Sequence, residues 1–224
     1  MTVSAPGALP PPRAVTHRIP KLQRSVEKRL YAPWFWGKDF STNWAMGHIP
    51  TWRRVLAPWR NVPIRILEIG SWEGRSAVFF LNFLKRSHIT CVDTFGGGHD
   101  TVDNELTPEV PKIEARFDRN LAPFRGRFEK IRQPSGDALP LLATAGRKFD
   151  LAYIDGSHTY ADVLLDSQLT WPMVVTGGVV IWDDYDWALQ PDRPGPAIDE
   201  FLAGKEGQYR LLSKSGQMIV EKRA

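Results

Sequence analysis

Cysteine is almost absent from this chain, because Cys91 is the only one among 224 residues. A single cysteine excludes an internal disulfide framework and fits a reducing compartment, so we expect a cytoplasmic protein. The sequence also lacks an apolar run long enough to cross a bilayer and the apolar core of a signal peptide, so we expect no membrane span. The length allows one large α/β domain with a full core.

Acidic residues are scarce near the N-terminus, and this scarcity explains the sequence pI of about 9.3. Residues 1–30 hold one acid, Glu27, against six basic residues, whereas residues 31–224 are close to neutral. The larger part of the chain therefore offers no basic platform, and nucleic acid is not an expected partner. The basic tail could still touch phosphate or anionic lipid.

Composition divides the chain into three parts. Residues 1–20 are rich in proline, alanine, serine and threonine, which predicts a disordered basic leader. Residues 21–60 hold five of the nine tryptophans and predict an aromatic-rich helical cap. These rings either pack a leading helix against a sheet or line a substrate pocket, and both interpretations stay open. Residues 61–224 form the expected main domain.

Apolar runs alternate with helical patterns from residue 64 onward, which is typical of a mostly parallel sheet. We expect an α/β fold with a Rossmann-like, seven-stranded sheet, helices on both faces and an antiparallel C-terminal strand. Residues 94–111 predict a long loop that serves as a lid. The expected strands are near 64–69, 88–93, 127–132, 149–155 and 179–182, followed by a hairpin of 209–212 and 218–220.

A glycine turn follows the first of these strands, in the sequence Glu68-Ile69-Gly70-Ser71-Trp72-Glu73-Gly74-Arg75-Ser76. Glycines at such a turn allow tight bending and close ligand approach. The carboxylate of Glu73 would repel a diphosphate, so the turn suits S-adenosylmethionine (SAM) better than a dinucleotide. Asp93 follows Gly70 by 23 residues, where an acid is placed to accept the ribose hydroxyls.

Three carboxylates follow two later strands. Asp155 ends the run at 149–155, and Asp183 and Asp184 end the run at 179–182. Acids gathered at one sheet edge repel one another unless a cation or protons compensate, and hard oxygen ligands favour Mg²⁺. The alternative is that Asp155 merely caps the helix that follows it.

These motifs resemble the class I SAM-dependent methyltransferases, and the Asp155-Gly156-Ser157-His158 sequence with Asp183-Asp184 is similar to the methyltransferase domain 24 family and to metal-dependent O-methyltransferases. The resemblance implies a SAM site, a Mg²⁺ site held by Asp155, Asp183 and Asp184, and His158 as general base beside Asp155. It implies O-methylation of a small hydroxylated molecule, whose identity the sequence does not give. The implied SAM-binding residues are Glu68, Gly70, Ser71, Gly74, Ser76, Asp93, Asp137 and Asp155.

Several alternatives remain open at this stage. Asp137 either contacts the adenine ring or caps a helix, and His158 could be a surface residue at a helix start. A metal-independent methyltransferase, an RNA methyltransferase that uses the basic tail, a hydroxylase and a non-enzymatic SAM-binding protein are also compatible with the pattern. The aromatic segment offers an interface for a homo-oligomer.

Overall fold

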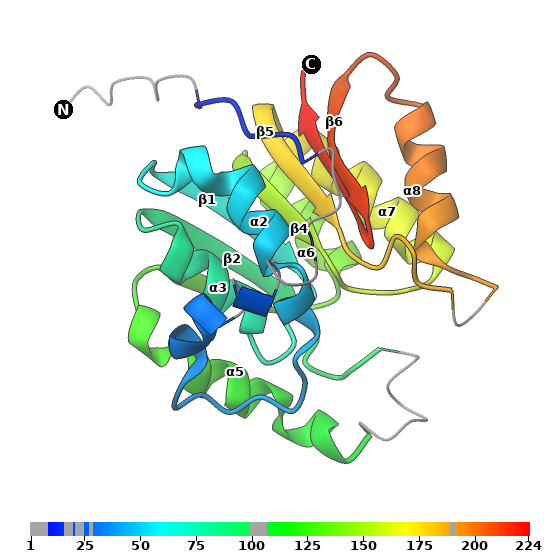
Figure 1. The fold of residues 1–224 in the computed structure, drawn as a ribbon. Coiled ribbons are helices and arrows are strands. Elements are labelled where there is room, and N and C mark those ends of the chain that lie inside the picture. The colour runs from blue at the N-terminus through cyan, green and yellow to red at the C-terminus, as the bar shows by residue number, and fades with distance from the viewer. Residues whose placement is uncertain (1–8, 16–19, 21–24, 27–28, 99–106, 189–190) are drawn as a thin grey trace.

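The computed structural model describes residues 9–15, 20, 25–26, 29–98, 107–188 and 191–224. Its centre is a seven-stranded sheet in the order β3-β2-β1-β4-β5-β7-β6 (Figure 1). The strands are β1 (Ile64–Ile69), β2 (Ser87–Asp93), β3 (Phe128–Arg132), β4 (Phe149–Ile154), β5 (Val174–Trp182), β6 (Tyr209–Ser215) and β7 (Gln217–Lys222).

All pairings among β1 to β5 are parallel, and β7 runs antiparallel to both of its neighbours. The expected Rossmann-like sheet with an antiparallel strand near the C-terminus is therefore confirmed. Central parallel strands are covered on both faces, which explains why all six residues of β4 are buried. Cys91 is fully buried in β2, as expected for a core cysteine.

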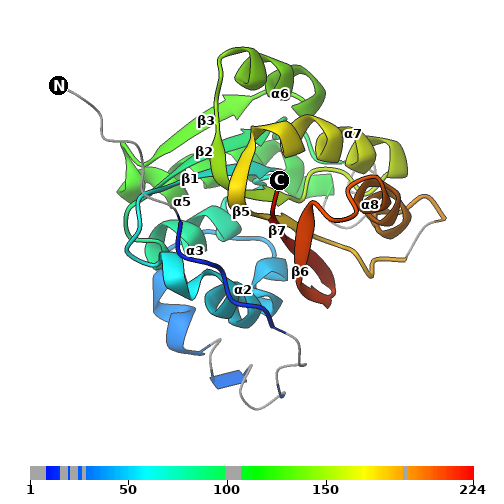
Figure 2. The same ribbon diagram turned by 90° about the horizontal axis from the view of Figure 1, so that it is seen from above.

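Helices cover both faces of the sheet (Figure 2). One face packs against α2 (Ile49–Leu56), α3 (Arg75–Phe83) and α5 (Ile113–Leu121), and the other against α6 (Ser135–Thr144), α7 (Tyr160–Thr170) and α8 (Pro194–Ala203). The helix α8 was not anticipated from the sequence. The short 3₁₀ helices are η1 (Ala32–Phe35), η2 (Trp44–Gly47), η3 (Ala57–Trp59), η4 (Thr107–Lys112), η5 (Ala122–Phe124) and η6 (Trp171–Met173). No helix in the described part of the chain is long and apolar enough to cross a membrane.

The aromatic segment serves the core in part. Trp52 and Trp59 are fully buried, whereas Trp36 and Trp44 are 75% and 58% exposed. The interpretation that these rings pack against the sheet therefore holds for Trp52 and Trp59. Core packing does not account for Trp36 and Trp44. The expected lid at 94–111 contains η4 at its end, and its central residues 99–106 lie outside the described residues.

The expectation of a disordered leader is wrong for residues 9–15. Arg13 donates its amide to Val55 of α2, and the amide of Val15 donates to Leu212 of β6. The indole of Trp59 donates to the carbonyl of Pro10 at 2.6 Å. These bonds satisfy polar groups of a proline-rich segment that forms no element of its own. Residues 1–8 and 16–19 lie outside the described residues.

Candidate functional site

The carboxyl ends of four neighbouring strands lie side by side. The amide of Gly70 donates to the end of β2, the amide of Asp155 to the end of β1, and the amide of Asp183 to the end of β4. Together with the strand registers, these bonds place Asp93, Gly70, Asp155 and Asp183 in one row. The row crosses the point between β1 and β4 where the strand order reverses, which is where open α/β sheets bind ligands.

Gly70 permits a very close approach between the first turn and the end of β4. Its φ is +79°, and a Cβ at this position would lie 1.9 Å from the carbonyl oxygen of Asp155. Gly74 has a φ of +81°, and its Cβ would lie 2.4 Å from the side chain of Leu121 on α5. Gly70 is thus required by backbone conformation and by space, whereas Gly74 is required chiefly by its backbone conformation. Trp72, between them, also has a positive φ of 48°.

Glu68 lies inside this turn and pairs with no cationic side chain among the described residues. Its side chain is fully buried, and its Oε2 accepts a hydrogen bond from the Ser71 hydroxyl at 2.7 Å. Burial raises the pKa of Glu68 to about 7, against the lowering effect of hydroxyl and thiol groups from Ser76, Ser71 and Cys91. No group in the described ranges donates a hydrogen bond to its Oε1 atom. A buried acceptor with free capacity fits an ammonium group.

Asp93 holds the backbone of the turn. Its Oδ2 accepts from the amides of Ser71 and Trp72 at 2.7 Å each, and its Oδ1 accepts from the amide of Phe95 at 2.6 Å. Burial raises the pKa of Asp93, although these three bonds oppose the shift. The predicted contact with ribose hydroxyls would therefore be made by a carboxylate that already shapes the turn.

Asp155 and Asp183 meet at the hydroxyl of Tyr153. That hydroxyl donates to Asp155 Oδ2 at 2.8 Å and also lies within hydrogen-bond distance of Asp183 Oδ2. The Oδ1 of Asp183 accepts from Gln217 Nε2 at 3.0 Å and from the amide of Asp184 at 2.9 Å. Burial, and then the charges of Asp183 and Asp184, raise the pKa of Asp155 well above its ordinary value.

Asp155, His158 and Asp184 form a group suited to a cation. Each offers one ligand atom, and these atoms lie within 4.8 Å of one another. His158 Nε2 is 2.8 Å from Asp184 Oδ2, and Asp184 adopts a positive φ of +54° just after β5. Asp183 is not part of this group, because its oxygens face Tyr153 and Gln217. The two carboxylates therefore fit a divalent ion, with the His158 imidazole beside them, and Asp183 stays a predicted ligand.

The remaining predicted residues occupy different places. Ser76 is buried in the first turn of α3 and lies near Glu68. Asp137 is exposed in the first turn of α6, where Pro134 takes the cap position, so the alternative of Asp137 as the helix cap is wrong. Its contact with adenine stays a prediction. His158 lies in the turn between β4 and α7 and packs against Trp187, with 4.9 Å between the ring centres.

The sequence analysis missed three residues at this site. Tyr153 shares a strand face with Asp155 because strands repeat every two residues, and this spacing could have revealed it. Gln217 and His48 gave no such signal. Gln217 comes from β7 and His48 from the residue before α2, with its Nε2 3.6 Å from Asp183 Oδ1. Only the tertiary fold brings these two to the acids.

Comparisons with known proteins agree with this geometry. A family described as a methyltransferase domain matches residues 67–185, more than half of the chain. The chain is similar to the uncharacterised protein R132 of Acanthamoeba polyphaga mimivirus, with 26% identity over 155 residues that cover 65% of this chain and 64% of that protein. It is also 26% identical over 162 residues to mycinamicin VI 2''-O-methyltransferase of Micromonospora griseorubida, covering 69% of this chain and 35% of that protein. The chain thus spans less than two thirds of the length of either relative.

Solved structures share the fold. The methyltransferase MycE, in complex with Mg, S-adenosylhomocysteine (SAH) and mycinamycin VI, has a TM-score of 0.60 at 20% identity and covers 88% of this chain and 53% of that one. The O-methyltransferase NovP has a TM-score of 0.57 at 20% identity, with 73% of each chain covered. By its family match, its fold and its glycine turn, the chain belongs to the methyltransferase domain 24 family of class I SAM-dependent methyltransferases.

Proposed function

We propose that this protein transfers the methyl group of SAM to a hydroxyl group of a small molecule, with help from a divalent metal. The observation that carries the proposal is the row of Asp93, Gly70, Asp155 and Asp183, which joins the glycine turn to the acidic group at one sheet edge. The similarity to mycinamicin VI 2''-O-methyltransferase supports a hydroxylated natural-product-like acceptor, such as a sugar or a polyketide.

The proposed cofactor site is the turn after β1. Glu68, with its unpartnered Oε1, would receive the ammonium of SAM, while Gly70 lets the ligand approach the backbone. Asp93 would accept the ribose hydroxyls at the end of β2. Ser71, Gly74, Ser76, Asp137 and Asp155 complete the set that we assign to the cofactor.

The proposed metal is Mg²⁺, held by Asp155 and Asp184 with open positions for water and acceptor oxygens. Asp183 is the third predicted ligand. When bound, SAM supplies an electrophilic methyl group, and the cation supplies positive charge beside the acceptor hydroxyl.

The chain's own residues orient the acceptor and move its proton. His158 would take up the hydroxyl proton as general base. The carboxylate of Asp184, 2.8 Å from His158 Nε2, compensates the charge that the ring gains. Tyr153, in the strand β4 that leads into Asp155, fixes that carboxylate in place because its hydroxyl donates a hydrogen bond to it. Alignment of the acceptor with the methyl group is then the main contribution of the protein.

Calorimetric titrations of SAH and of Mg²⁺ test both parts of the proposal. Wild-type protein should bind SAH, and Mg²⁺ should give heat that is lost in Asp184→Asn and Asp155→Asn. Asp118→Asn, on α5 with a side chain that is 54% exposed and pairs with Lys130, is the matched control and should bind Mg²⁺ like the wild type. Asp183→Asn shows whether that residue is a ligand or supports its neighbours.

The outcomes separate the cofactor from the metal. Absence of SAH binding would overturn the proposed activity. Binding of SAH without a response to Mg²⁺ would retain the methyltransferase and remove the metal. In that case the acids would bind the acceptor through hydrogen bonds, and methyl transfer would be insensitive to a chelator. Screening of hydroxylated acceptors follows once SAH binding is established.

A further inference from the structure

Residues 38–48, which we call the strap, cross the edge of the candidate site. Near one end, the amide of Ser41 donates to Glu73 Oε2 in the glycine turn at 2.6 Å. In the middle, Trp44 packs on Trp72 with 5.8 Å between the ring centres. At the other end, His48 lies 3.6 Å from Asp183. The strap thus reaches from the proposed cofactor turn to the row of acids.

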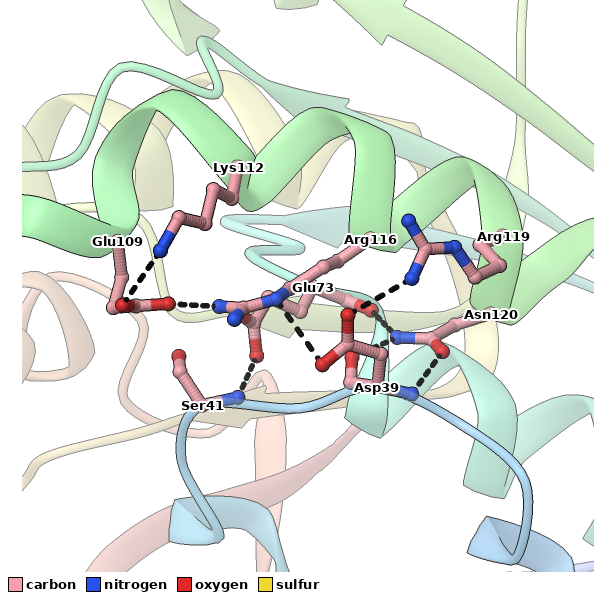
Figure 3. A network of polar contacts seen from close by, with 8 residues as sticks. All are labelled: Asp39, Ser41, Glu73, Glu109, Lys112, Arg116, Arg119 and Asn120. Carbon is pink, nitrogen blue, oxygen red and sulfur yellow. Dashed lines mark hydrogen bonds and ion pairs between the residues drawn. The ribbon is translucent and has the colours of Figure 1, made fainter.

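Arg116 on α5 joins the strap to the turn (Figure 3). Its Nη1 lies 2.6 Å from Glu73 Oε1 and 2.5 Å from Glu109 Oε2, and its Nε lies 3.2 Å from Asp39 Oδ1. The Arg116 side chain is only 14% exposed. The fixed fork of a guanidinium suits simultaneous contact with several carboxylates, which a lysine could not reproduce. One side chain therefore contacts the strap, the turn and η4.

Asn120 holds the strap from the next turn of the same helix. It lies four residues after Arg116 and thus on the same face of α5. Its Oδ1 accepts from the amide of Asp39 at 2.9 Å, and its Nδ2 donates to the carbonyls of Asp39 at 2.7 Å and Glu73 at 3.0 Å. Because the Asn120 side chain binds both the amide and the carbonyl of Asp39, it holds the backbone of the strap, whereas Arg116 holds the Asp39 carboxylate.

Glu73 is the buried acid of this network. Its side chain is 1% exposed, although the sequence analysis assigned its charge to the repulsion of a diphosphate. A buried carboxylate is costly unless it is paired and hydrogen-bonded, and here Arg116 and the amide of Ser41 supply both. The charges of the network also balance, because Asp39, Glu73 and Glu109 face Arg116, Lys112 and Arg119.

We propose that Arg116 is a positioning residue that, through Glu73 and Asp39, holds the strap on the glycine turn and so places Trp44 and His48 as one wall of the active site. This role rests on the proposed function, because the wall matters only if the turn binds SAM. Trp44 keeps 58% of its surface exposed although it packs on the turn, so it offers a flat apolar face beside the site. An ordinary surface network would stabilise the fold and leave ligand binding untouched.

The test compares hydrogen exchange and ligand binding in matched variants of the full chain. Arg116→Met removes the guanidinium, and Arg119→Met is its control on the same helix, since Arg119 is 64% exposed and its one ion pair within the described part of the chain is with Asp39. In Arg116→Met we expect exchange of the strap amides to be about tenfold faster than in the control. We also expect SAH to bind about tenfold more weakly, because a displaced wall misplaces the groups that contact the ligand.

A double variant separates positioning from stability. Arg116→Met with Glu73→Gln leaves no buried unpaired charge, so its unfolding midpoint should recover relative to Arg116→Met. A positioning role requires strap exchange to stay fast and SAH binding to stay weak in this double variant, because the link to Asp39 is still missing. If slow exchange of the strap amides and tight SAH binding returned in the double variant together with its stability, the proposal would be overturned.

Other results of the exchange and binding experiments also decide whether Arg116 is a positioning residue. Equal strap exchange in Arg116→Met and Arg119→Met would overturn the positioning role. If wild-type protein bound no SAH, the proposed activity would fail, while the exchange comparison would still decide whether Arg116 holds the strap. Should Arg116→Met fail to fold, Asp39→Asn removes the carboxylate on the strap itself, which is 42% exposed, and the same exchange comparison applies.

Discussion

Glu68 and Glu73 show how position decides the state of two carboxylates in one turn. Both are buried, at 0% and 1% exposed. Glu73 is paired with Arg116 at 2.6 Å. Glu68 receives hydrogen bonds only from neutral groups among the described residues, and burial raises its pKa to about 7. Sequence spacing could place both residues in the turn. It could not show which of them would find a cation, because Arg116 comes from a helix more than forty residues later in the chain.

The stability of the ligand-free protein should depend on pH through Glu68. Since its pKa is raised from 4.5 to about 7, the stabilising effect of its protonated form is complete below about pH 4.5 and is lost as the pH rises through about 7. Glu68→Gln cannot ionise, so we expect it to exceed the wild type at pH 8 by on the order of 3 kcal/mol in the free energy of unfolding.

Urea unfolding at pH 5 and pH 8 measures this effect. Glu129→Gln is a control of opposite sign, because a hydrogen bond from Arg147 lowers the pKa of Glu129. That variant should lose stability relative to the wild type at pH 8, by an amount reduced by solvent exposure. If Glu68→Gln showed the same difference from the wild type at both pH values, the raised pKa would be wrong.

At the scale of elements, contact between the turn and β4 depends on Gly70. The Gly70→Ala variant would place a methyl group 1.9 Å from the carbonyl oxygen of Asp155 at a φ of +79°. The turn must then move away from β4, and we expect a loss of more than about 3 kcal/mol in the free energy of unfolding. SAH binding should be lost with it.

Gly146→Ala provides the matched control for this substitution. Gly146 also has a positive φ, +69°, but nothing lies within 4 Å of its Cβ position. Gly146→Ala should therefore lower the free energy of unfolding by only about 1 kcal/mol, through backbone strain. Equal costs at the two positions in chemical denaturation would show that the close approach at Gly70 is unimportant.

At the scale of the whole molecule, residues far apart in sequence complete the domain. Residues 9–15 connect η3, α2 and β6 through Pro10, Arg13 and Val15. Arg210 of β6 also donates to the carbonyl of Pro12 at 2.9 Å. The N-terminal segment therefore crosses the side of the domain that α2 and β6 share.

Removal of residues 1–15 should destabilise the domain by several kcal/mol. The truncation would leave the buried indole of Trp59 without its acceptor, and it would uncover apolar surface against which Leu9 and Val15 pack. The loss of a buried hydrogen bond costs about 1–3 kcal/mol, and the uncovered surface adds to it. Removal of residues 1–8, which retains these contacts, is the control. Equal unfolding midpoints for the two truncations would contradict the role of residues 9–15.

The sequence by itself determined the sheet, the glycine turn and the row of acids, because each depends on local rules. Continuous apolar runs specify parallel strands, and glycines specify the turns that follow them. The pattern also placed Glu68, Asp93, Asp155 and Asp183 at the ends of neighbouring strands, since parallel strands end at one edge. Its error at residues 9–15 concerns a segment without periodicity. Helix α8 was missed although its buried residues Ala197, Ile198, Phe201 and Leu202 recur at helical spacing.

Only the tertiary structure decided which of these groups meet. The strap lies on the turn because Arg116 and Asn120 reach it from α5, and Asp183 turns toward Tyr153 and Gln217 while Asp184 meets His158. No spacing encodes these contacts, because each joins elements separated by loops whose paths are set by packing. The charge state of Glu68 follows from the same cause, since burial and the absence of a cation depend on everything that surrounds the turn.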